Sequence, residues 1–382
     1  MEPKRLKIVY CTPALYMAGG VERVLTLKTN YFAEHFEYDI TIILTEGKGK
    51  SPFYPLSEKI KIINLDINYE QLWSCSFFKK VVLYLIKQRK YKKLLKNELL
   101  RIRPDITVSL LRREVNFISK IHDGSKKIGE LHVNRANYRN FEKNESNILK
   151  ELFAKWWMNN LISHLRSLDK FIVLTEEDKS AWVELDNVVA IPNPMTFKTD
   201  AISLLKEKRV IAVGRYAYQK GFDLLLQAWS IVEKQCSDWS LAVYGAGDKT
   251  PYFRILQELG IDKSRCFLNG NTTEIYQEYL NSSMLVMSSR FEGLSMALLE
   301  AMSCGLPIVS FACPCGPKDV IVDGVNGLLA PKENIQQLAE SMIKLMKSPE
   351  MAYKMGLEAK KRSEDFKIEV VAERWKRLFE SL

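Results

Sequence analysis

The sequence predicts an α/β protein with two consecutive halves, in each of which short buried strands alternate with helices. The first observation is periodicity, because short apolar runs bounded by turn residues alternate with longer segments of helical spacing. The second is that a strand, a glycine-containing loop and a helix follow one another near the N-terminus and again near residue 210. The third is length, because 382 residues suffice for about two domains with separate cores.

Composition is that of an ordinary globular protein, with 47% apolar and 27% charged residues. No apolar run approaches the ~18 residues that a membrane span needs. Residues 1–5 lead straight into a strand, so we expect no signal peptide. The net charge of +10 is concentrated in residues 1–195, which predicts an anionic surface or partner for this half.

Seven cysteines, an odd number, are scattered along the chain. This pattern favours reduced thiols and a cytoplasmic protein. Cys313 and Cys315 are too close together for a zinc knuckle, and no second Cys/His pair lies nearby. We therefore interpret them as structural thiols.

The first half, residues 1–195, is expected to form an N-terminal Rossmann-like domain. Its strands are the short apolar runs, and its helices are the segments with helical spacing. The expected strands are 7–12, 38–44, 60–65, 106–110, 127–131, 171–174 and 188–191, and the expected helices are 21–36, 77–103, 145–166 and a short one capped by Thr175. Pro192-Asn193-Pro194 then breaks regular structure, and we expect the domain boundary near 195–207.

The loop before the first helix contains Gly19 and Gly20. It does not match the dinucleotide fingerprint, because the G-x-G-x-x-G spacing is absent. Two interpretations are open. The glycines let the backbone approach a ligand phosphate at the helix start, or they serve a tight turn that needs glycine.

The expected helix at 77–103 is long, basic and amphipathic. Ten Lys or Arg residues between Lys79 and Arg103 face a single acid, Glu98. Its apolar stripes are supplied by Phe78, Val81, Val82, Leu85, Leu94, Leu95 and Leu99. Such a helix can lie on an anionic membrane, or it can be a domain-surface helix whose lysines are solvated.

Glu130 and His132 stand at the carboxyl end of the expected strand at 127–131, where ligands gather in open α/β sheets. A histidine there is either structural or part of a ligand site. Trp156 and Trp157, in the expected helix at 145–166, are interpreted as core or interface aromatics.

The second half starts again with a strand and is expected to form a second Rossmann-like domain, residues 196–366. The expected strands are 210–213, 241–244, 266–269, 284–287 and 307–310, with a turn and a short strand at 323–329, and the expected helices are 222–232, 274–280, 296–303, 335–347, 351–364 and 369–381. We expect the final segment, 367–382, to cross back onto the first domain. Two such halves imply a cleft between the domains.

A basic loop bounded by Gly214 and Gly221 enters the helix at 222–232. Arg215 and Lys220 in this loop can both reach an anion held between them. A later loop, 245–250, begins like a dinucleotide loop, but Thr250 stands where the third glycine belongs, so that signal is weak.

The segment from Ser288 to Pro307 places Glu292 in a loop and Glu300 on the following helix. Ser295 is a suitable N-cap, and Gly305 stops the helix. The helix N-terminus, with its free backbone N–H groups, is an anion site, and the flanking carboxylates can accept hydrogen bonds from sugar hydroxyls. The alternative is an ordinary strand–helix turn with two solvated glutamates.

These motifs together resemble the GT-B glycosyltransferases, and specifically the large retaining family known as GT4. The resemblance covers nearly the whole chain and is strongest from 209 to 330. Its signatures, in order, are the glycine loop Gly19-Gly20-Val21-Glu22, the phosphate-binding pair Arg215 and Lys220, the E-x7-E motif from Glu292 to Glu300, and the elements Gly305-Leu306-Pro307 and Asn326-Gly327-Leu328.

The resemblance implies a role for each residue. Arg215 and Lys220 would neutralise the leaving diphosphate, and the backbone at Gly293, Leu294 and Ser295 would bind the same phosphates, with Gly19 and Gly20 approaching from the other domain. Glu300 would accept hydrogen bonds from the ribose. Glu292 would hold hydroxyls of the transferred sugar, and His132 would lie near its anomeric centre. Both act by positioning and electrostatics, because the family lacks an agreed protein nucleophile.

No Asp-x-Asp metal motif is present, so we expect metal-independent transfer without a cofactor. The segment from Phe311 to Asp319 is similar to that of bacterial enzymes that build surface polysaccharides and lipid-linked oligosaccharides, which favours a UDP-sugar donor. A glycan acceptor linked to polyprenyl diphosphate or lipopolysaccharide, at the anionic inner face of the cell membrane, would suit the basic N-terminal half. The enzyme would then be cytoplasmic and peripheral to that membrane.

Three other functions are compatible with parts of the sequence. A non-catalytic nucleotide-sugar binding protein could lose Glu292 or Glu300, but both are present. Nucleic-acid binding is suggested by charge alone, without an interleaved basic and aromatic motif, and we do not expect it. Two alternatives stay open: a sugar-phosphate synthase or phosphorylase of the same architecture, since a fold does not fix its chemistry, and a non-catalytic nucleotide-sugar binding protein.

Overall fold

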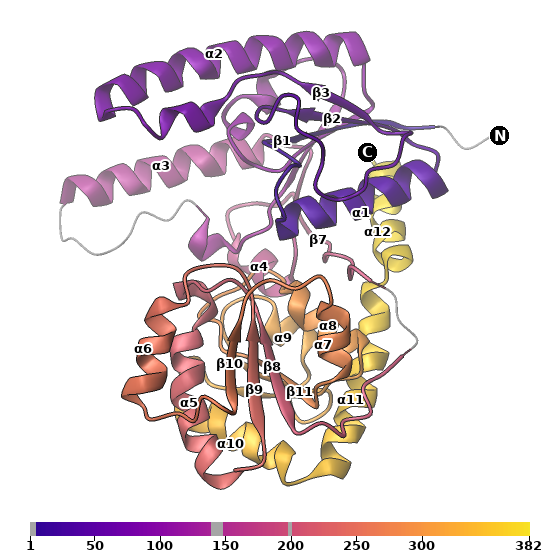
Figure 1. Cartoon of the computed structure of the whole chain (residues 1–382). Helices are drawn as coiled ribbons and strands as arrows, with labels where there is room; N and C mark the ends of the chain where they lie inside the picture. Colours follow the sequence, from indigo (N-terminus) through magenta and orange to yellow (C-terminus); the bar gives the residue numbers. More distant parts are fainter. Residues whose placement is uncertain (1–4, 139–147, 198–200) are drawn as a thin grey trace. The chain divides into compact units, whose positions relative to one another are not determined.

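The computed structural model describes residues 5–138, 148–197 and 201–382. The chain divides into two compact units (Figure 1). Unit 1 comprises Met1–Leu174, Lys179–Ile191 and Val371–Leu382, and unit 2 comprises Thr175–Asp178 and Pro192–Val370. Each unit contains one parallel β-sheet, so the protein is α/β with two Rossmann-like domains, as predicted.

The sheet of unit 1 has seven strands in the order β3-β2-β1-β4-β5-β6-β7, all paired in parallel. Its strands are β1 (Lys7–Thr12), β2 (Asp39–Leu44), β3 (Lys61–Asn64), β4 (Ile106–Ser109), β5 (Lys126–Glu130), β6 (Lys170–Val173) and β7 (Val188–Ala190). The central strands are buried on both faces, which explains why they read as continuous apolar runs in the sequence.

The helices of unit 1 separate these strands. The α-helices are α1 (Gly20–His35), α2 (Phe77–Ile102) and α3 (Ile148–Arg166), followed by α4 (Glu176–Ala181), which starts in unit 2. Short 3-10 turns lie at Tyr69–Leu72, Glu114–Asn116, Ile118–Lys120 and Arg135–Asn137. The predicted cap of α4 is confirmed, because the backbone N–H of Asp178 donates to Thr175 Oγ1 at 3.1 Å.

The sheet of unit 2 has six parallel strands in the order β10-β9-β8-β11-β12-β13. Its strands are β8 (Arg209–Val213), β9 (Ser240–Tyr244), β10 (Cys266–Asn269), β11 (Met284–Met287), β12 (Ile308–Phe311) and β13 (Gly327–Ala330). Counted from β8, this is the order 3-2-1-4-5-6 of the Rossmann fold, and the first six strands of unit 1 have the same order.

The helices of unit 2 begin with α5 and end with α11. They are α5 (Phe222–Gln235), α6 (Thr250–Glu258), α7 (Ile275–Leu280), α8 (Met296–Ser303), α9 (Pro317–Val320), α10 (Ile335–Met346) and α11 (Pro349–Ser363), with 3-10 turns at Tyr218–Lys220 and Glu364–Phe366. The core of the unit lies between the sheet and α5 with α10, and includes Trp229, Val243 and Met342. The sequence analysis did not predict the helices α6 and α9.

The C-terminal helix α12 (Ile368–Glu380) follows unit 2 in the sequence, but residues from Val371 onward belong to unit 1. It lies beside α1 (Figure 1). The Phe379 ring contacts Phe32 with ring centroids 5.8 Å apart, and the Trp375 ring covers the ammonium of Lys28 at 4.1 Å. The aromatic face of α12 thus completes the core beneath α1.

The structure also bears on the predicted helix at 145–166, on its tryptophans and on the cysteines. Trp156 is 60% exposed, so of the two interpretations, core or interface aromatic, the core one is wrong for this residue and the interface one stays a prediction. The predicted helix at 145–166 is confirmed from Ile148 onward, and residues 145–147 lie outside the described residues. All seven cysteines are free thiols, and only Cys75 among them is not buried.

No helix in the described part of the chain combines the length and the apolar character needed to span a membrane.

Candidate functional site

The candidate site of unit 2 lies at the carboxyl ends of the neighbouring strands β8 and β11. Here the strand order reverses, because β9 lies on the other side of β8, and open α/β sheets bind ligands at such a point. The loop 214–221 follows β8 and the loop 288–295 follows β11. Two hydrogen bonds join the loops: Arg290 N–H donates to Gln219 O at 2.8 Å, and Ser288 Oγ donates to Lys220 O at 2.9 Å.

Lys220 and Glu292 form an ion pair within these loops. Lys220 Nζ donates to Glu292 Oε1 at 2.6 Å, and Ser289 Oγ donates to the same oxygen at 2.6 Å. Glu292 is 5% exposed, so its carboxylate is largely removed from water and depends on these donors. The interpretation of Glu292 as a solvated surface acid is therefore wrong.

Arg290 fixes the position of Lys220, and sequence reasoning did not identify it. The residue is 8% exposed, and its guanidinium pairs with both carboxylate oxygens of Asp223, at 2.9 and 2.6 Å. It also donates to Tyr218 O at 2.8 Å and stacks on the Tyr218 ring at 4.1 Å. These contacts hold the turn that carries Lys220 against the loop that carries Glu292. The hydrogen bonds that Arg290 donates to Asp223 raise the pKa of Arg290.

Glu300 is also buried, at 4% exposure, but it has different partners. Thr196 Oγ1 donates to its Oε1 at 2.5 Å, and the hydroxyl of Tyr279 donates to its Oε2 at 3.1 Å. Both of these partners are hydroxyl groups, and each donates to a different oxygen of the carboxylate. Glu300 therefore does not match the solvated alternative either.

The remaining predicted residues of unit 2 border the same loops. Ser295 stands at the N-cap position of α8, as predicted, but its side chain makes no capping hydrogen bond. Gly293 and Leu294 precede it in the loop, so the backbone N–H groups at the start of α8 point to the carboxyl edge of the sheet. Arg215 is exposed, and over the described part of the chain it has no ion-pair partner. Its cation is available to an incoming anion.

Gly221 shows why this loop needs glycine. Its φ is +61°, and a Cβ added there would lie 2.1 Å from the carbonyl oxygen of Ser288. Both the left-handed backbone and the close approach of the two loops exclude a side chain. The glycine thus allows the loop after β8 to pack directly on the loop after β11.

Gly19 and Gly20 lie in unit 1, where the loop after β1 enters α1. Gly19 has φ −98°, and Gly20 has no positive φ, so neither conformation requires glycine. A Cβ added at Gly19 would lie 1.9 Å from Glu22 Oε2, so that side chain would have to move. A Cβ added at Gly20 would meet no atom within 4 Å, so the space in front of this backbone is open.

His132 lies two residues beyond β5 in unit 1, and its side chain is 7% exposed. Its Nε2 is 3.2 Å from Glu130 Oε1, which also accepts from Lys28 Nζ at 2.5 Å. Burial alone would raise the pKa of Glu130, but the neighbouring Lys28 and His132 outweigh burial and lower it to about 2. Glu130 is therefore a buried carboxylate that stays ionised beside His132.

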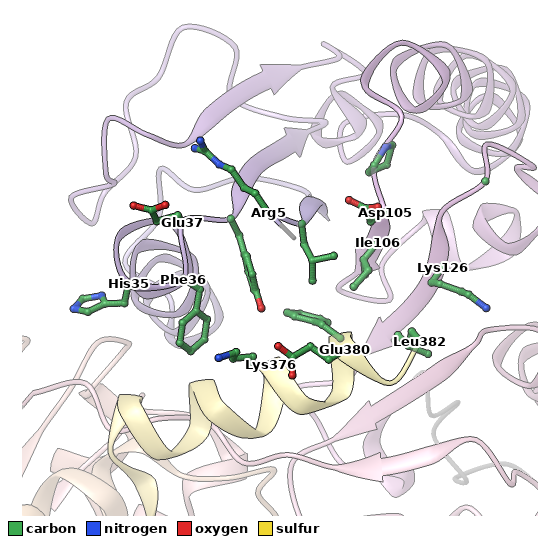
Figure 2. Close-up of a pocket in the computed structure, with 15 residues that line it drawn as sticks. Arg5, His35, Phe36, Glu37, Asp105, Ile106, Lys126, Lys376, Glu380 and Leu382 are labelled. Carbon is green, nitrogen blue, oxygen red and sulfur yellow. The ribbon is translucent and has the colours of Figure 1, made fainter. Parts of the chain in front are cut away.

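A cavity of about 750 Å³ in unit 1 is separate from these residues (Figure 2). Its lining residues include Arg5, Tyr38, Asp105 and Lys126, which stand at or just before the first residues of β1, β2, β4 and β5. The cavity therefore lies at the amino edge of the sheet. Ligands of open α/β sheets bind at the carboxyl edge, so we do not assign it to the candidate site.

Comparison with known proteins agrees with this geometry. Residues 197–362 match the family model described as "Glycosyl transferases group 1". An uncharacterized glycosyltransferase of Haemophilus influenzae is 29% identical over 94% of this chain and 96% of its own length. The amylovoran biosynthesis glycosyltransferase AmsD of Erwinia amylovora is 25% identical over 97% of this chain and 98% of its own length.

The fold also matches solved structures. A mutant of TarM from S. aureus, crystallised with Fondaparinux, alpha-GlcNAc-glycerol and UDP, superposes with a TM-score of 0.74 at 18% identity and covers 98% of this chain and 99% of its own. The two Rossmann-like units and the solved structure give this chain the GT-B fold. Residues 197–362 are similar to the group 1 glycosyl transferases, and the two relatives named above are glycosyltransferases.

Proposed function

We propose that the protein is a retaining glycosyltransferase of the GT4 type that moves a hexose or N-acetylhexosamine from a UDP-sugar to a glycan acceptor. The proposed acceptor is linked to a lipid, and the proposed role is bacterial polysaccharide or lipopolysaccharide synthesis at the inner face of the cell membrane. The AmsD relative, named for amylovoran biosynthesis, supports the polysaccharide role, and the UDP in the TarM structure supports the donor.

The observation that carries the proposal is the Lys220–Glu292 pair at the strand-order reversal of unit 2. A diphosphate bound beside Arg215 and at the start of α8 would attract the ammonium of Lys220. Glu292 would then lose one donor, and hydroxyls of the transferred sugar would replace it. A single ligand with a diphosphate and a sugar thus satisfies both members of the pair.

The proposed chemistry needs no protein nucleophile. The bond between the anomeric carbon and the diphosphate oxygen breaks, the acceptor oxygen bonds to the same carbon on the same face, and the leaving phosphate accepts the proton of the acceptor hydroxyl. Arg215 and Lys220 stabilise the charge that develops on the diphosphate, which is the electrostatic contribution expected of two fixed cations. On this basis we propose metal-independent transfer.

The other predicted residues have supporting roles in this proposal. Glu300 would exchange the hydroxyls of Thr196 and Tyr279 for those of the donor ribose, because its carboxylate already accepts two hydroxyl donors. The open backbone at Gly20, with Gly19, would approach the phosphates. His132, beside Glu130, would lie near the anomeric carbon of the bound sugar.

A panel of nucleotide sugars tests the function. Thermal shift identifies a donor that stabilises the protein, and donor hydrolysis together with transfer to bacterial glycolipid acceptors identifies the reaction. We expect one UDP-sugar to raise the melting temperature and to be hydrolysed slowly without acceptor, with retention in the product. Stabilisation by no UDP-sugar, or a product with inverted anomeric configuration, would overturn the proposal.

A further inference from the structure

A contiguous apolar surface is exposed at the start of α2. The exposed fractions are 74% for Trp73, 73% for Phe77, 83% for Phe78, 44% for Val81, 57% for Val82, 52% for Leu85 and 53% for Ile86. These seven residues, which we name the 73–86 patch, fall within one helix and the turn before it. Isolated exposed apolar side chains are common, but so many large ones in one short segment mark an interaction site.

The same face of α2 turns from apolar to basic along its length. Phe78, Leu85, Arg89, Lys92 and Lys96 follow one another at spacings of seven, four, three and four residues, and these spacings place them along one side of an α-helix. The exposed basic side chains on this side are Arg89, Lys92, Lys93 and Lys96. The outer face of α2 is thus apolar in its first three turns and cationic in the next two.

A second, adjoining face of α2 is packed in the core of unit 1. Tyr91, Leu95 and Leu99 are at most 1% exposed, and Tyr84 is partly buried against the same core. The helix is therefore anchored through this second face, and the exposed face does not result from an unpacked helix. A partner outside the unit would explain why its exposed residues are apolar.

We propose that the outer face of α2 binds the surface of an anionic lipid bilayer. The apolar 73–86 patch enters the boundary between headgroups and acyl chains, and the basic residues from Arg89 to Lys96 contact the lipid phosphates. Charge complementarity favours lipid over a second copy of the chain, because a copy would bring the same cationic face against itself. The proposal adds to the proposed function by naming the surface that holds the enzyme beside a lipid-linked acceptor. Its evidence comes from α2 alone.

Cys75 provides a probe inside the patch. It lies between Trp73 and Phe77 and is partly exposed, whereas the other six cysteines are buried. An environment-sensitive fluorophore on Cys75 should move to shorter wavelength when the labelled protein is mixed with vesicles. The full-length protein is tested at low and physiological salt with vesicles of phosphatidylcholine alone and with added phosphatidylglycerol.

Two sets of substitutions separate the apolar and the charged contributions. We expect Phe77→Ser with Phe78→Ser to raise the lipid concentration at half-binding at least tenfold. Replacing Lys92 and Lys93 with Gln should weaken binding roughly fivefold per charge removed. The matched controls are on α11 of unit 2, where Tyr353→Ser and Leu357→Ser remove exposed apolar groups and Lys354→Gln and Lys361→Gln remove exposed charges.

The outcomes distinguish the partners. Binding to anionic but not to neutral vesicles, with loss only in the α2 variants, would support the proposal. Equal binding to neutral vesicles, no binding to either, or a fluorophore shift that depends on protein concentration without lipid would overturn it, and the last result would identify a second copy as the partner. The vesicle assay contains no donor or acceptor, so it can succeed or fail independently of the proposed transfer reaction.

Discussion

Replacing Lys28 with Met should destabilise unit 1 strongly. The Lys28 ammonium and the Glu130 carboxylate are 1% and 2% exposed, and they lie 2.5 Å apart. Without Lys28, Glu130 would be a buried charge without its closest cation. Breaking such a pair costs about 3–5 kcal/mol. The neighbouring cations also lower the pKa of Glu130 to about 2, against the opposing effect of burial.

Hydrogen exchange measured by mass spectrometry suits this test, because it reports opening of each unit separately and does not assume that both unfold together. At neutral pH we expect amides of β1 and β5 in Lys28→Met to exchange roughly 10²- to 10³-fold faster, as a loss of about 3–4 kcal/mol requires. Amides of β8 and β11 in unit 2 should not change. Lys59→Met, which removes an exposed lysine of the same unit, is the matched control.

The double variant Lys28→Met with Glu130→Leu decides the physical reason. Removing both charges leaves no unpaired ion, so most of the lost stability should return. If the single and double variants exchange equally fast, the loss comes from packing against Trp375 instead of from the stranded carboxylate. A change below about 0.5 kcal/mol in the single variant would refute the reasoning altogether.

The remaining predictions concern acid stability, the donor site and the thiols. The folded-state pKa of Glu130 is depressed, so its contribution to stability is present above about pH 4.5 and is lost as the pH falls through about 2. Hydrogen exchange of the unit 1 amides, measured at a series of acidic pH values, will check this loss. The Glu130→Leu variant should lack the transition. Lys220→Ala and Glu300→Ala should each lower donor affinity or turnover at least tenfold, ~1.4 kcal/mol, in steady-state assays, and undiminished activity would remove that residue from the site. Gly20→Ala should leave the melting temperature unchanged, since its Cβ meets open space, but should raise KM for the donor; an unchanged KM would exclude phosphate contact at this backbone. A maleimide should label Cys75 before the buried thiols, and rapid loss of several thiols in the native state would contradict the packing.

Much of the fold could be predicted because parallel strands buried on both faces are continuous apolar runs. The strand at Met284–Met287 and the helix that starts at Met296 are confirmed for that reason. The helix α6 was not predicted, because the glycines at 245 and 247 just before it are typical of a phosphate-binding loop. Its amphipathic spacing from Tyr252 to Leu256 was the available signal.

The site was predictable in its residue types and less so in its contacts. Lys220 and Glu292 were each identified from local motifs, but their ion pair joins residues far apart in sequence and depends on which strands are neighbours. The role of Arg290 could not be inferred, because it needs Asp223 on another element to hold its guanidinium. On α2, the spacing indicated an amphipathic helix but not which apolar stripe faces the core, since both stripes contain large aliphatic residues.

The return of α12 to unit 1 has a consequence for biosynthesis. Residues 1–191 leave the ribosome long before Val371–Leu382, yet the Trp375 and Phe379 rings complete the surroundings of Lys28 and Phe32. Unit 2 is contiguous over most of its length, but it extends to Val370, so it too is completed only near the end of synthesis. The N-terminal unit, although translated first, must wait for the last turns of the polypeptide before its core closes.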